Sequence, residues 1–173
     1  MAAPMKDLGP CAVIWDPDGT PVELNPTFGA VMFRSEDSIA EIFEDQKGVT
    51  PVDAVYTGKA TELEVPMTRS SLAQLEKVIP GAVKGTANLK VSNVVGCSLL
   101  DMAKPIVLKP YGCAGVSTDE AEWLFIHKAA PVTVVEIGYD VSSQRVFRAT
   151  FKCFPSEATG TLGEIWRIGA HSG

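Results

Sequence analysis

The sequence predicts a mainly β fold with one packed α-helix, in which two antiparallel sheets pack together as a sandwich or a barrel. Fifteen Gly and twelve Pro are scattered along the 173 residues, a distribution typical of many turns between short strands. Several segments alternate apolar and polar residues, as strands with one buried face do, and only one segment has helical spacing. With 46% apolar residues, the chain can bury a core, and we expect a single domain over residues 1–173.

The first part of the chain has the pattern of strands joined by polar turns. Its first apolar run ends in Asp16-Pro17-Asp18-Gly19, whose Pro and Gly favour a turn. Further on, Glu62 and Glu64 alternate with apolar neighbours, which predicts a strand with one buried and one solvent-exposed face. The expected strands are Cys11–Trp15, Phe28–Arg34, a polar and acidic strand within Ser35–Gln46, and Val52–Tyr56 and Thr61–Val65 around a Thr57-Gly58-Lys59 turn.

One helix is expected directly after these strands. Apolar residues recur at helical spacing between positions 72 and 79. Ser71 and Gln74 form an S-x-x-Q capping box, in which each side chain satisfies a backbone N–H that the helix leaves free. Pro80-Gly81 ends the helix, because proline cannot continue the hydrogen-bond ladder. A helix this short has to pack its apolar stripe on a sheet to be stable.

The rest of the chain returns to strand patterns. The clearest alternation places Phe147, Ala149, Phe151 and Cys153 on one face, opposite Arg148, Thr150 and Lys152. The expected strands are Leu89–Val95, Pro105–Leu108, Trp123–His127, Val132–Tyr139, Gln144–Phe154 and Thr161–Ile168.

Charge and cysteine content exclude several classes of protein. The net charge is −6, the wrong sign for gripping a phosphate backbone. Residues 1–64 carry 12 acids and 4 bases, whereas residues 65–173 carry 9 acids and 11 bases, so we expect one surface to be negative. The four cysteines form no CxxC pair and are expected to be reduced. No apolar run suits a signal peptide or a membrane span, so we expect synthesis in the cytoplasm and no membrane partner.

Enzyme motifs are weak or incomplete. Gly58-Lys59 lacks the rest of a phosphate-binding loop, because Asp53 stands where a glycine is required and Ala60 where Ser or Thr is required. A cysteine nucleophile with a histidine base, His127 or His171, and a carboxylate dyad, Glu41 with Glu44 or Glu62 with Glu64, are alternatives with little support. We therefore expect no enzyme, no cofactor and no metal. A small basic cluster, interpreted as a solvated strand edge or a subunit contact, consists of Arg145, Arg148 and Lys152.

The order of segments points further than any single motif. A polar and acidic strand leads into Glu44-Asp45-Gln46-Lys47-Gly48-Val49-Thr50-Pro51 and then Tyr56-Thr57-Gly58. The capped helix, Gly96-Cys97-Ser98-Leu99-Leu100-Asp101-Met102, His127-Lys128-Ala129-Ala130-Pro131 and an aromatic strand ending Phe154-Pro155-Ser156 follow. This succession resembles the tail tube (major tail) proteins of tailed bacteriophages over roughly residues 9–169. Phe154-Pro155-Ser156 departs from the Pro-Asp common in that family, and residues 111–118 look particular to this sequence.

The resemblance implies a structural virion protein and not an enzyme. Such subunits form hexameric rings that stack into the hollow tail tube, the conduit for genome DNA at ejection. The implied partners are further copies of the chain, a tape-measure protein in the lumen, and the tail terminator and baseplate or tail tip proteins. DNA passes through without specific binding. The implied location is the virion tail, assembled in the host bacterial cytoplasm, and the resemblance leaves open whether a contractile sheath surrounds the tube.

Two groups of residues are candidates for this role. A lumen that transmits DNA should be negative, since basic residues would trap the polymer, and the candidate lumen acids are Glu41, Glu44, Glu62 and Glu64. The segment from Glu44 to Lys59 is expected to be a long loop that is mobile in the monomer and ordered by the next ring. Its candidate contact residues are Asp45, Gln46, Lys47, Gly48, Val49, Thr50, Pro51, Thr57, Gly58 and Lys59.

Three alternatives stay open. A type VI secretion tube protein has a similar architecture and carries effectors instead of DNA. A tail terminator or other connector forms one ring that does not stack. An enzyme using Glu or Cys requires a defined pocket and loses activity on a single substitution.

Overall fold

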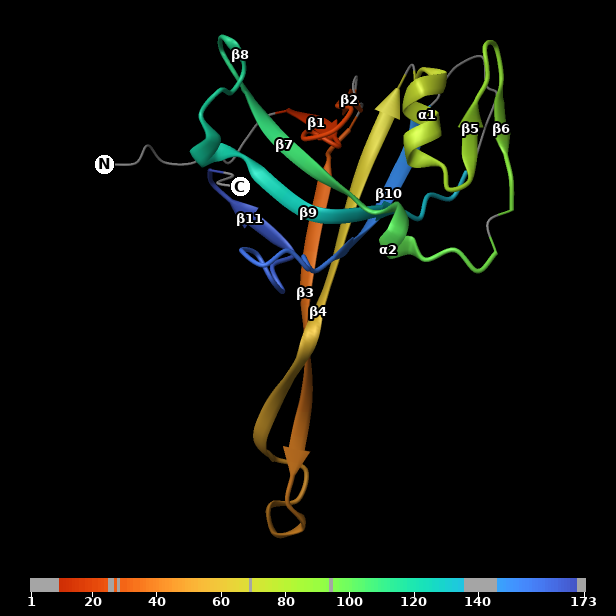
Figure 1. Ribbon diagram of the computed structural model, residues 1–173. Helices are drawn as coiled ribbons and strands as arrows, with labels where there is room; N and C mark the ends of the chain where they lie inside the picture. Colours follow the sequence, from red (N-terminus) through yellow and green to blue (C-terminus); the bar gives the residue numbers. More distant parts are fainter. Residues whose placement is uncertain are drawn as a thin grey trace.

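The computed structural model describes residues 10–24, 27, 29–68, 70–93, 95–135 and 146–170. Within them, nine strands form one large antiparallel sheet, in the order β2-β1-β7-β9-β10-β4-β3 (Figure 1). Strand β8 pairs with β7, and β11 pairs with β9. The strands are β1 (Cys11–Trp15), β2 (Val22–Glu23), β3 (Met32–Phe43), β4 (Pro51–Thr68), β7 (Lys104–Gly112), β8 (Gly115–Val116), β9 (Leu124–Pro131), β10 (Val146–Phe154) and β11 (Trp166–Ile168).

The remaining elements form a small unit beside the sheet. Helix α1 (Leu72–Val78) is followed by a two-stranded hairpin of β5 (Ala82–Lys84) and β6 (Leu89–Val91). Three short helical turns complete the described fold: η1 (Asp45–Lys47), α2 (Leu99–Met102) and η2 (Glu120–Glu122). The predicted class is confirmed: the chain is mainly β with one packed helix, and its strands form a large and a small antiparallel sheet.

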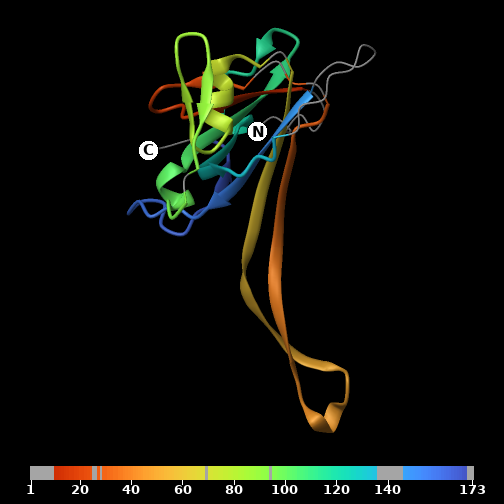
Figure 2. The same cartoon turned by 90° about the vertical axis from the view of Figure 1, so that its right-hand side faces the viewer.

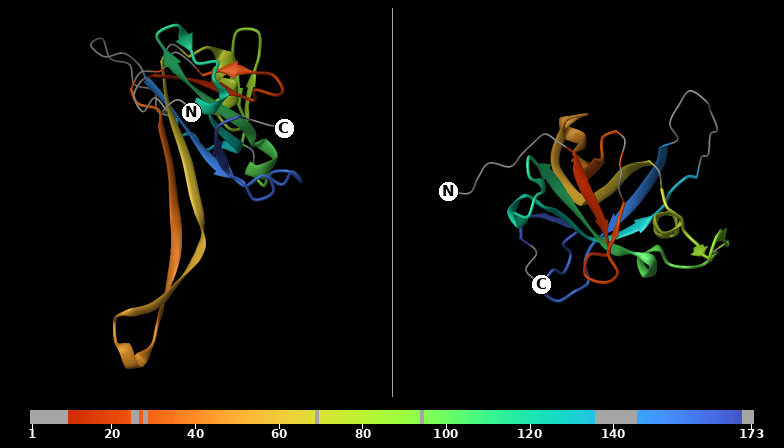
Figure 3. Two further views of the ribbon diagram at one scale, coloured as in Figure 1. Left: turned by 90° about the vertical axis from the view of Figure 1, so that its left-hand side faces the viewer. Right: turned by 90° about the horizontal axis from the view of Figure 1, so that it is seen from above.

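The core lies inside the curved large sheet. Trp15 of β1 and Phe151 of β10 have ring centroids 5.5 Å apart, although β7 and β9 stand between their strands in the sheet order. The sheet must therefore curl so that separated strands meet over one interior, which Figure 3 (right) views from above. Val78 and Ile79 close this core from the side of α1.

The predicted strand alternation is confirmed where the sheet is half-buried. Along β10 the burial pattern alternates, with Phe147, Ala149, Phe151 and Cys153 buried. On β4, Thr61, Leu63 and Val65 are buried while Glu62 is exposed. The period of two in the sequence thus identifies the inward face of both strands.

The capping box of α1 is also confirmed. The Gln74 backbone N–H donates to Ser71 Oγ at 3.3 Å, and the Ser71 N–H donates to Gln74 Oε1 at 2.8 Å. The Gln74 side chain also donates to the Glu23 carbonyl at 2.7 Å, which ties the start of the helix to β2. One residue pair therefore both starts the helix and anchors it to the sheet.

Several predicted strand limits are wrong. The two strands expected around Thr57-Gly58-Lys59 are one continuous strand, β4, and the turn is a bulge within it. The strand expected over Thr161–Ile168 begins only at Trp166, the one expected over Leu89–Val95 ends at Val91, and β7 and β9 run beyond their expected ends. Residues 132–135 are not in a strand, and the rest of the Val132–Tyr139 prediction lies outside the described residues, as do Phe28, Gln144, Arg145 and His171.

No helix among the described residues is long and apolar enough to cross a membrane. Nor does any group of three or more His, Cys, Asp or Glu in that part of the chain lie close enough to hold a metal ion.

Candidate interaction surface on a projecting hairpin

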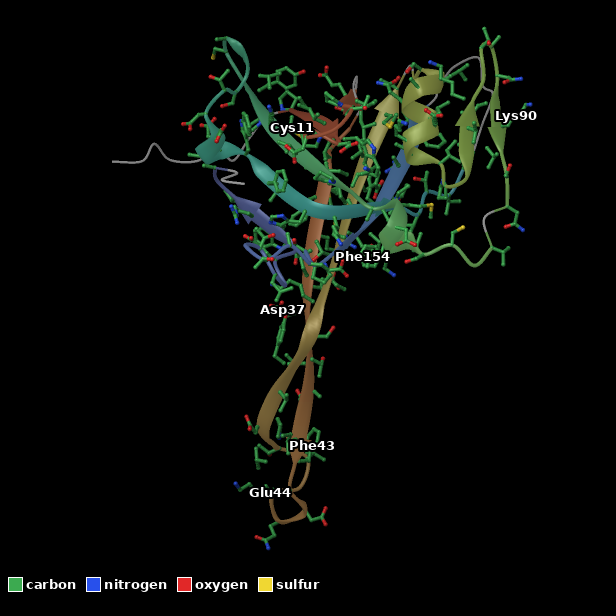
Figure 4. The ribbon with its side chains drawn as sticks, viewed as in Figure 1. Cys11, Asp37, Phe43, Glu44, Lys90 and Phe154 are labelled. Carbon is green, nitrogen blue, oxygen red and sulfur yellow. The ribbon has the colours of Figure 1, made fainter. Side chains whose placement is uncertain are left out.

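The most unusual feature of the molecule is a long hairpin that leaves the body. Strands β3 and β4 continue together far beyond the large sheet and end in a turn (Figures 1 and 2). We call residues 36–60, from the Glu36–Ala60 pair to the turn and back, the arm. None of these residues is buried. Asp37 lies where the arm leaves the body, and Phe43 and Glu44 lie near its end (Figure 4).

Two bulges shape the arm. The pairing shifts between Ser38–Gly58 and Ile39–Tyr56, which leaves Thr57 as an extra residue on β4. It shifts again between Ile42–Asp53 and Phe43–Pro51, next to the turn. Gly58 has a φ of 150°, a conformation open to glycine but not to most residues. Such bulges bend a strand and re-aim its side chains, and the first one places Tyr56 directly opposite Ile39.

Apolar side chains cover much of the arm although no neighbouring element packs on them. Ile39 is 61% exposed, Tyr56 57% and Phe43 53%. Alternation along β3 puts Ile39, Glu41 and Phe43 on one side, and cross-strand pairing adds Tyr56 and Ala54 to it. We call this set the apolar face of the arm. Several large apolar side chains exposed on one face mark a site that another molecule covers.

The arm is also acidic. It contains six acids and two bases, a balance of −4. Both bases already have acidic neighbours, because Lys59 Nζ lies 3.0 Å from Asp37 Oδ1 and Lys47 Nζ lies 3.5 Å from Glu44 Oε2. The hydrogen bond to Asp37 raises the pKa of Lys59. The acids that remain, Glu41 among them, give the arm a negative field.

The four predicted lumen acids do not gather in one place. Glu41 lies midway along the arm, and Glu44 lies at its end beside Lys47. Glu62 and Glu64 lie together on the outer face of β4, on the body of the molecule. Bases interleave with this second pair: Arg148 Nη1 is 2.6 Å from Glu64 Oε1, and Arg34 and Lys152 flank Glu62 in the strand register.

The predicted loop from Glu44 to Lys59 is mostly strand, which is a correction. Only residues 44–50 form the turn: Asp45, Gln46 and Lys47 make η1, and Gly48, Val49 and Thr50 complete it. Pro51, Thr57, Gly58 and Lys59 belong to β4 and pair with β3 or lie at its bulge. Pro51 is tolerated because it is the first residue of its strand, and Gly58 because a bulge accepts it.

Sequence reasoning therefore missed the arm itself. The sequence predicts a turn at Thr57-Gly58-Lys59 and a loop that contains Pro51, and thereby divides one long hairpin into two short strands and a loop. The available signal was the β-branched and aromatic content on both sides of Gly58, from Val52 to Val65.

A second exposed apolar feature lies at the other end of the molecule. A groove of about 350 Å³ runs between α1, β6 and the start of β10. Its apolar lining includes Leu75, Ile79, Leu89, Val91 and Phe147. Ser70 also lines it, and Ser70 Oγ is buried without a hydrogen-bond partner among the described residues. In Figures 1 and 2, α1 and the β5–β6 hairpin lie at the end of the body away from the tip of the arm.

The geometry gives the nucleophile alternative little support. Burial raises the pKa of Cys153 to about 12, with a smaller contribution from Glu62, so this thiol is protonated at neutral pH. His127 lies instead beside a carboxylate, with its Nε2 3.2 Å from Glu164 Oε2. Glu164 is held by Arg167, whose hydrogen bonds are the main cause of the lowered pKa of that carboxyl. This cluster joins β9 to the segment that begins β11.

Comparisons with known proteins add no identification: neither the protein-family models nor the curated proteins searched include a match to this chain.

Proposed function

We propose that the protein is a bacteriophage tail tube protein, a structural subunit whose hexameric rings stack into the hollow conduit for genome DNA. The observation that carries the proposal is the arm, which extends exposed Ile39, Phe43 and Tyr56 away from the body. A monomer gains nothing from this surface, because exposed apolar area costs about 25 cal/mol per Å² relative to burial. A neighbouring subunit that covers the arm recovers that free energy.

The order of segments that resembles the tail tube family supports the same proposal. The arm lies in the part of the sequence where that resemblance is most specific, from Glu44 through Pro51 to Gly58. In the proposed assembly the arm contacts the next ring. The arm is a paired hairpin and not the unpaired loop expected from the sequence. Even a marginally stable hairpin loses less conformational entropy on binding than an unpaired loop does.

Ring closure requires each subunit to offer two different edges. In the described sheet, β2 and β3 stand at the two ends of the strand order. Unpaired strand edges are surfaces on which a second chain can add a strand. In the proposed ring, edges of neighbouring subunits meet in this heterologous manner, one patch against a different patch.

In the proposed tube, DNA passes through the lumen without binding tightly to its wall. Net charge is −6, and a negative wall gains nothing from phosphate contacts, whose strength comes from counterion release by bases. Glu44, Glu62 and Glu64 remain the proposed lumen acids, and each has a base nearby. Glu41, the fourth acid predicted for the lumen, lies on the apolar face of the arm, so in this proposal it contacts the next ring instead. The further partners in this proposal are the tape-measure, terminator and baseplate or tail tip proteins.

Electron microscopy of the purified protein at high concentration tests the proposal. Hexameric rings stacked into hollow tubes are expected. Rings that never stack would instead favour a tail terminator or connector. A protein that stays monomeric under all assembly conditions, including addition of a preformed tail tip as initiator, would contradict the proposal. A type VI secretion tube gives similar particles, and neighbouring genes separate the two: a tape-measure gene and a portal, or an ATPase and a membrane complex.

A further inference from the structure

The arm and the groove lie at opposite ends of the same molecule. The tip of the arm points away from the body, while α1, β5 and β6 lie at the far side of it (Figures 1, 2 and 3). An arm that extends away from its own groove cannot fill it. Because the two apolar surfaces lie at opposite ends, only other molecules can cover them. If the other molecule is a second copy of this chain, the arm of one copy can cover the groove of the other.

The groove suits an apolar strand face that carries one hydroxyl. Its lining is almost entirely apolar, with Leu75 and Ile79 on one side and Val91 on the other. Ser70 Oγ is the exception, since it is buried and lacks a partner among the described residues. A buried hydroxyl without a hydrogen-bond partner destabilises the surface that holds it. Tyr56 combines an apolar ring with a hydroxyl that can share a hydrogen bond with Ser70.

Charge also favours the arm as the occupant. Residues 70–91, which supply most of the groove, contain three lysines and one glutamate. Lys90 lies on the face of the hairpin opposite the groove, so the charges that remain give a balance of +1. That glutamate, Glu76, already contacts Lys77 Nζ at 3.2 Å and accepts a hydrogen bond from the Lys84 N–H at 3.0 Å. The arm has a balance of −4. Opposite net charges favour association of the two surfaces and select against pairing of like ones.

We propose that the groove between α1, β6 and the start of β10 receives the apolar face of the arm from a second copy of this chain. The inference rests on the proposed function and names the receiving surface for the arm. Phe43 and Tyr56 enter the groove, and Glu41 between them lies toward Lys84. Lys84 is the lysine on the groove side of the hairpin, because it is the Cα partner of Leu89, whereas Lys90 points away (Figure 4).

This contact has a direction. The arm of one copy occupies the groove of the next copy, and the arm of that copy extends to a third. The contact thus joins two different surfaces. A row of copies leaves one unoccupied groove at one end and one uncovered arm at the other. Heterologous contacts of this kind grow into open stacks unless they close into a ring. The arm–groove contact therefore runs along the axis of the proposed tube and joins ring to ring.

Disulfide cross-linking between two full-length variants tests the contact. In a background with the exposed Cys97 and Cys113 replaced by serine, one variant carries Phe43→Cys and the other Val91→Cys. The matched control replaces Val91→Cys with Val83→Cys. Both valines are on the β5–β6 hairpin and are similarly exposed, at 60% and 61%, but Val83 pairs with Lys90 on the opposite face. After mixing, concentration and mild oxidation, we expect at least about fivefold more heterodimer with Val91→Cys, since a disulfide needs Cα atoms within about 7 Å.

Electron microscopy of the same samples separates this inference from the proposed function. Tubes with the preferred cross-link support both. Tubes without it would overturn the arm–groove contact and leave the tube proposal standing. With a preformed tail tip added as initiator, the cross-link without tubes would support the contact and contradict the tube. Absence of both under the same conditions would contradict both.

A charge exchange gives an independent check that does not depend on new thiols. Glu41→Lys or Lys84→Glu alone should reduce the fraction of assembled protein in sedimentation, and the double variant should restore it. Two losses that simply add in the double variant would overturn the pairing of these residues and with it the proposed orientation of the arm.

Discussion

Phe151 connects the two sides of the curved sheet. Its side chain is fully buried and its ring contacts Trp15 of β1, a strand three places away in the sheet order. Sequence alternation predicts that Phe151 points inward, because the period of two along β10 is uninterrupted. The partner across the interior could not be predicted in the same way, since it depends on how strongly the sheet curls.

Replacing Phe151 with alanine should lower the free energy of unfolding by about 3–5 kcal/mol, because the cavity left in the core cannot fully collapse. Phe43→Ala is the matched control, since the same change on the exposed arm should stay within about 0.5 kcal/mol. Urea denaturation of the unassembled protein measures both. Equal losses in the two variants would contradict the location of the core.

The Glu164 carboxylate, just before β11, lies between Arg167 of β11 and His127 of β9, whose Nε2 is 3.2 Å from Glu164 Oε2. It lies 2.7 Å from Arg167 Nη2 and 2.9 Å from Arg167 Nε, an arrangement in which both carboxylate oxygens accept. The Arg167 hydrogen bonds lower its pKa below the ordinary 4.5. A carboxyl with a depressed pKa in the folded state stabilises the fold above its unfolded pKa, and this contribution is lost as the pH falls through the folded value.

Glu164→Gln should therefore reduce the free energy of unfolding at neutral pH, and the difference from the unchanged protein should shrink as the pH falls below about 4.5. Glu157→Gln serves as the control, because its ion pair with Lys128 is made by a glutamate side chain that is 67% exposed and such pairs contribute little. Denaturation midpoints at several pH values measure the effect. A Glu164→Gln difference that stays constant down to pH 3 or below would count against this role of the carboxylate.

At the scale of the element, α1 and the arm show what local sequence can and cannot specify. The start of α1 was predictable because Ser71 and Gln74 satisfy each other within one turn. The arm was not, because Gly58 and Pro51 favour turns in isolation and only the pairing with β3 makes them part of a strand. Because β3 pairs with β4 along its whole length, the loop is limited to residues 44–50. The four predicted lumen acids therefore lie at separate places along the hairpin.

The arm should exchange its amide hydrogens quickly in the monomer. A two-stranded hairpin without further strands or a covering element is at best marginally stable, and no residue of the arm is buried. Burial by a neighbouring subunit should slow the amides of residues 39–43 and 53–56, while those of β10 stay slow in both states. Hydrogen exchange with mass spectrometry on monomers and assemblies measures this, and equal rates in the two states would argue against an interface there.

At the scale of the whole molecule, the arrangement favours assembly along one direction. The body has its own core, and the arm adds exposed apolar surface without adding to that core. Composition predicted the fold class and the excess of acids in the first part of the chain. It could not predict that part of this acidic segment projects from the body, because projection depends on where the neighbouring strands of the sheet end.

Removal of the arm separates folding from assembly. Replacing residues 38–58 with Asn-Gly joins Asp37 to Lys59, which pair directly, through a two-residue turn suited to a hairpin. Because the deleted residues include none that is buried, the free energy of unfolding of the body should change by less than about 1 kcal/mol.

Electron microscopy of the intact and the shortened protein, side by side under the same assembly conditions, tests the central claim most directly. The intact protein should form hollow stacked tubes, and the shortened protein should remain folded but give only monomers or single rings. Tubes of equal length and number from the shortened protein would contradict the account, because the arm would then have no part in stacking.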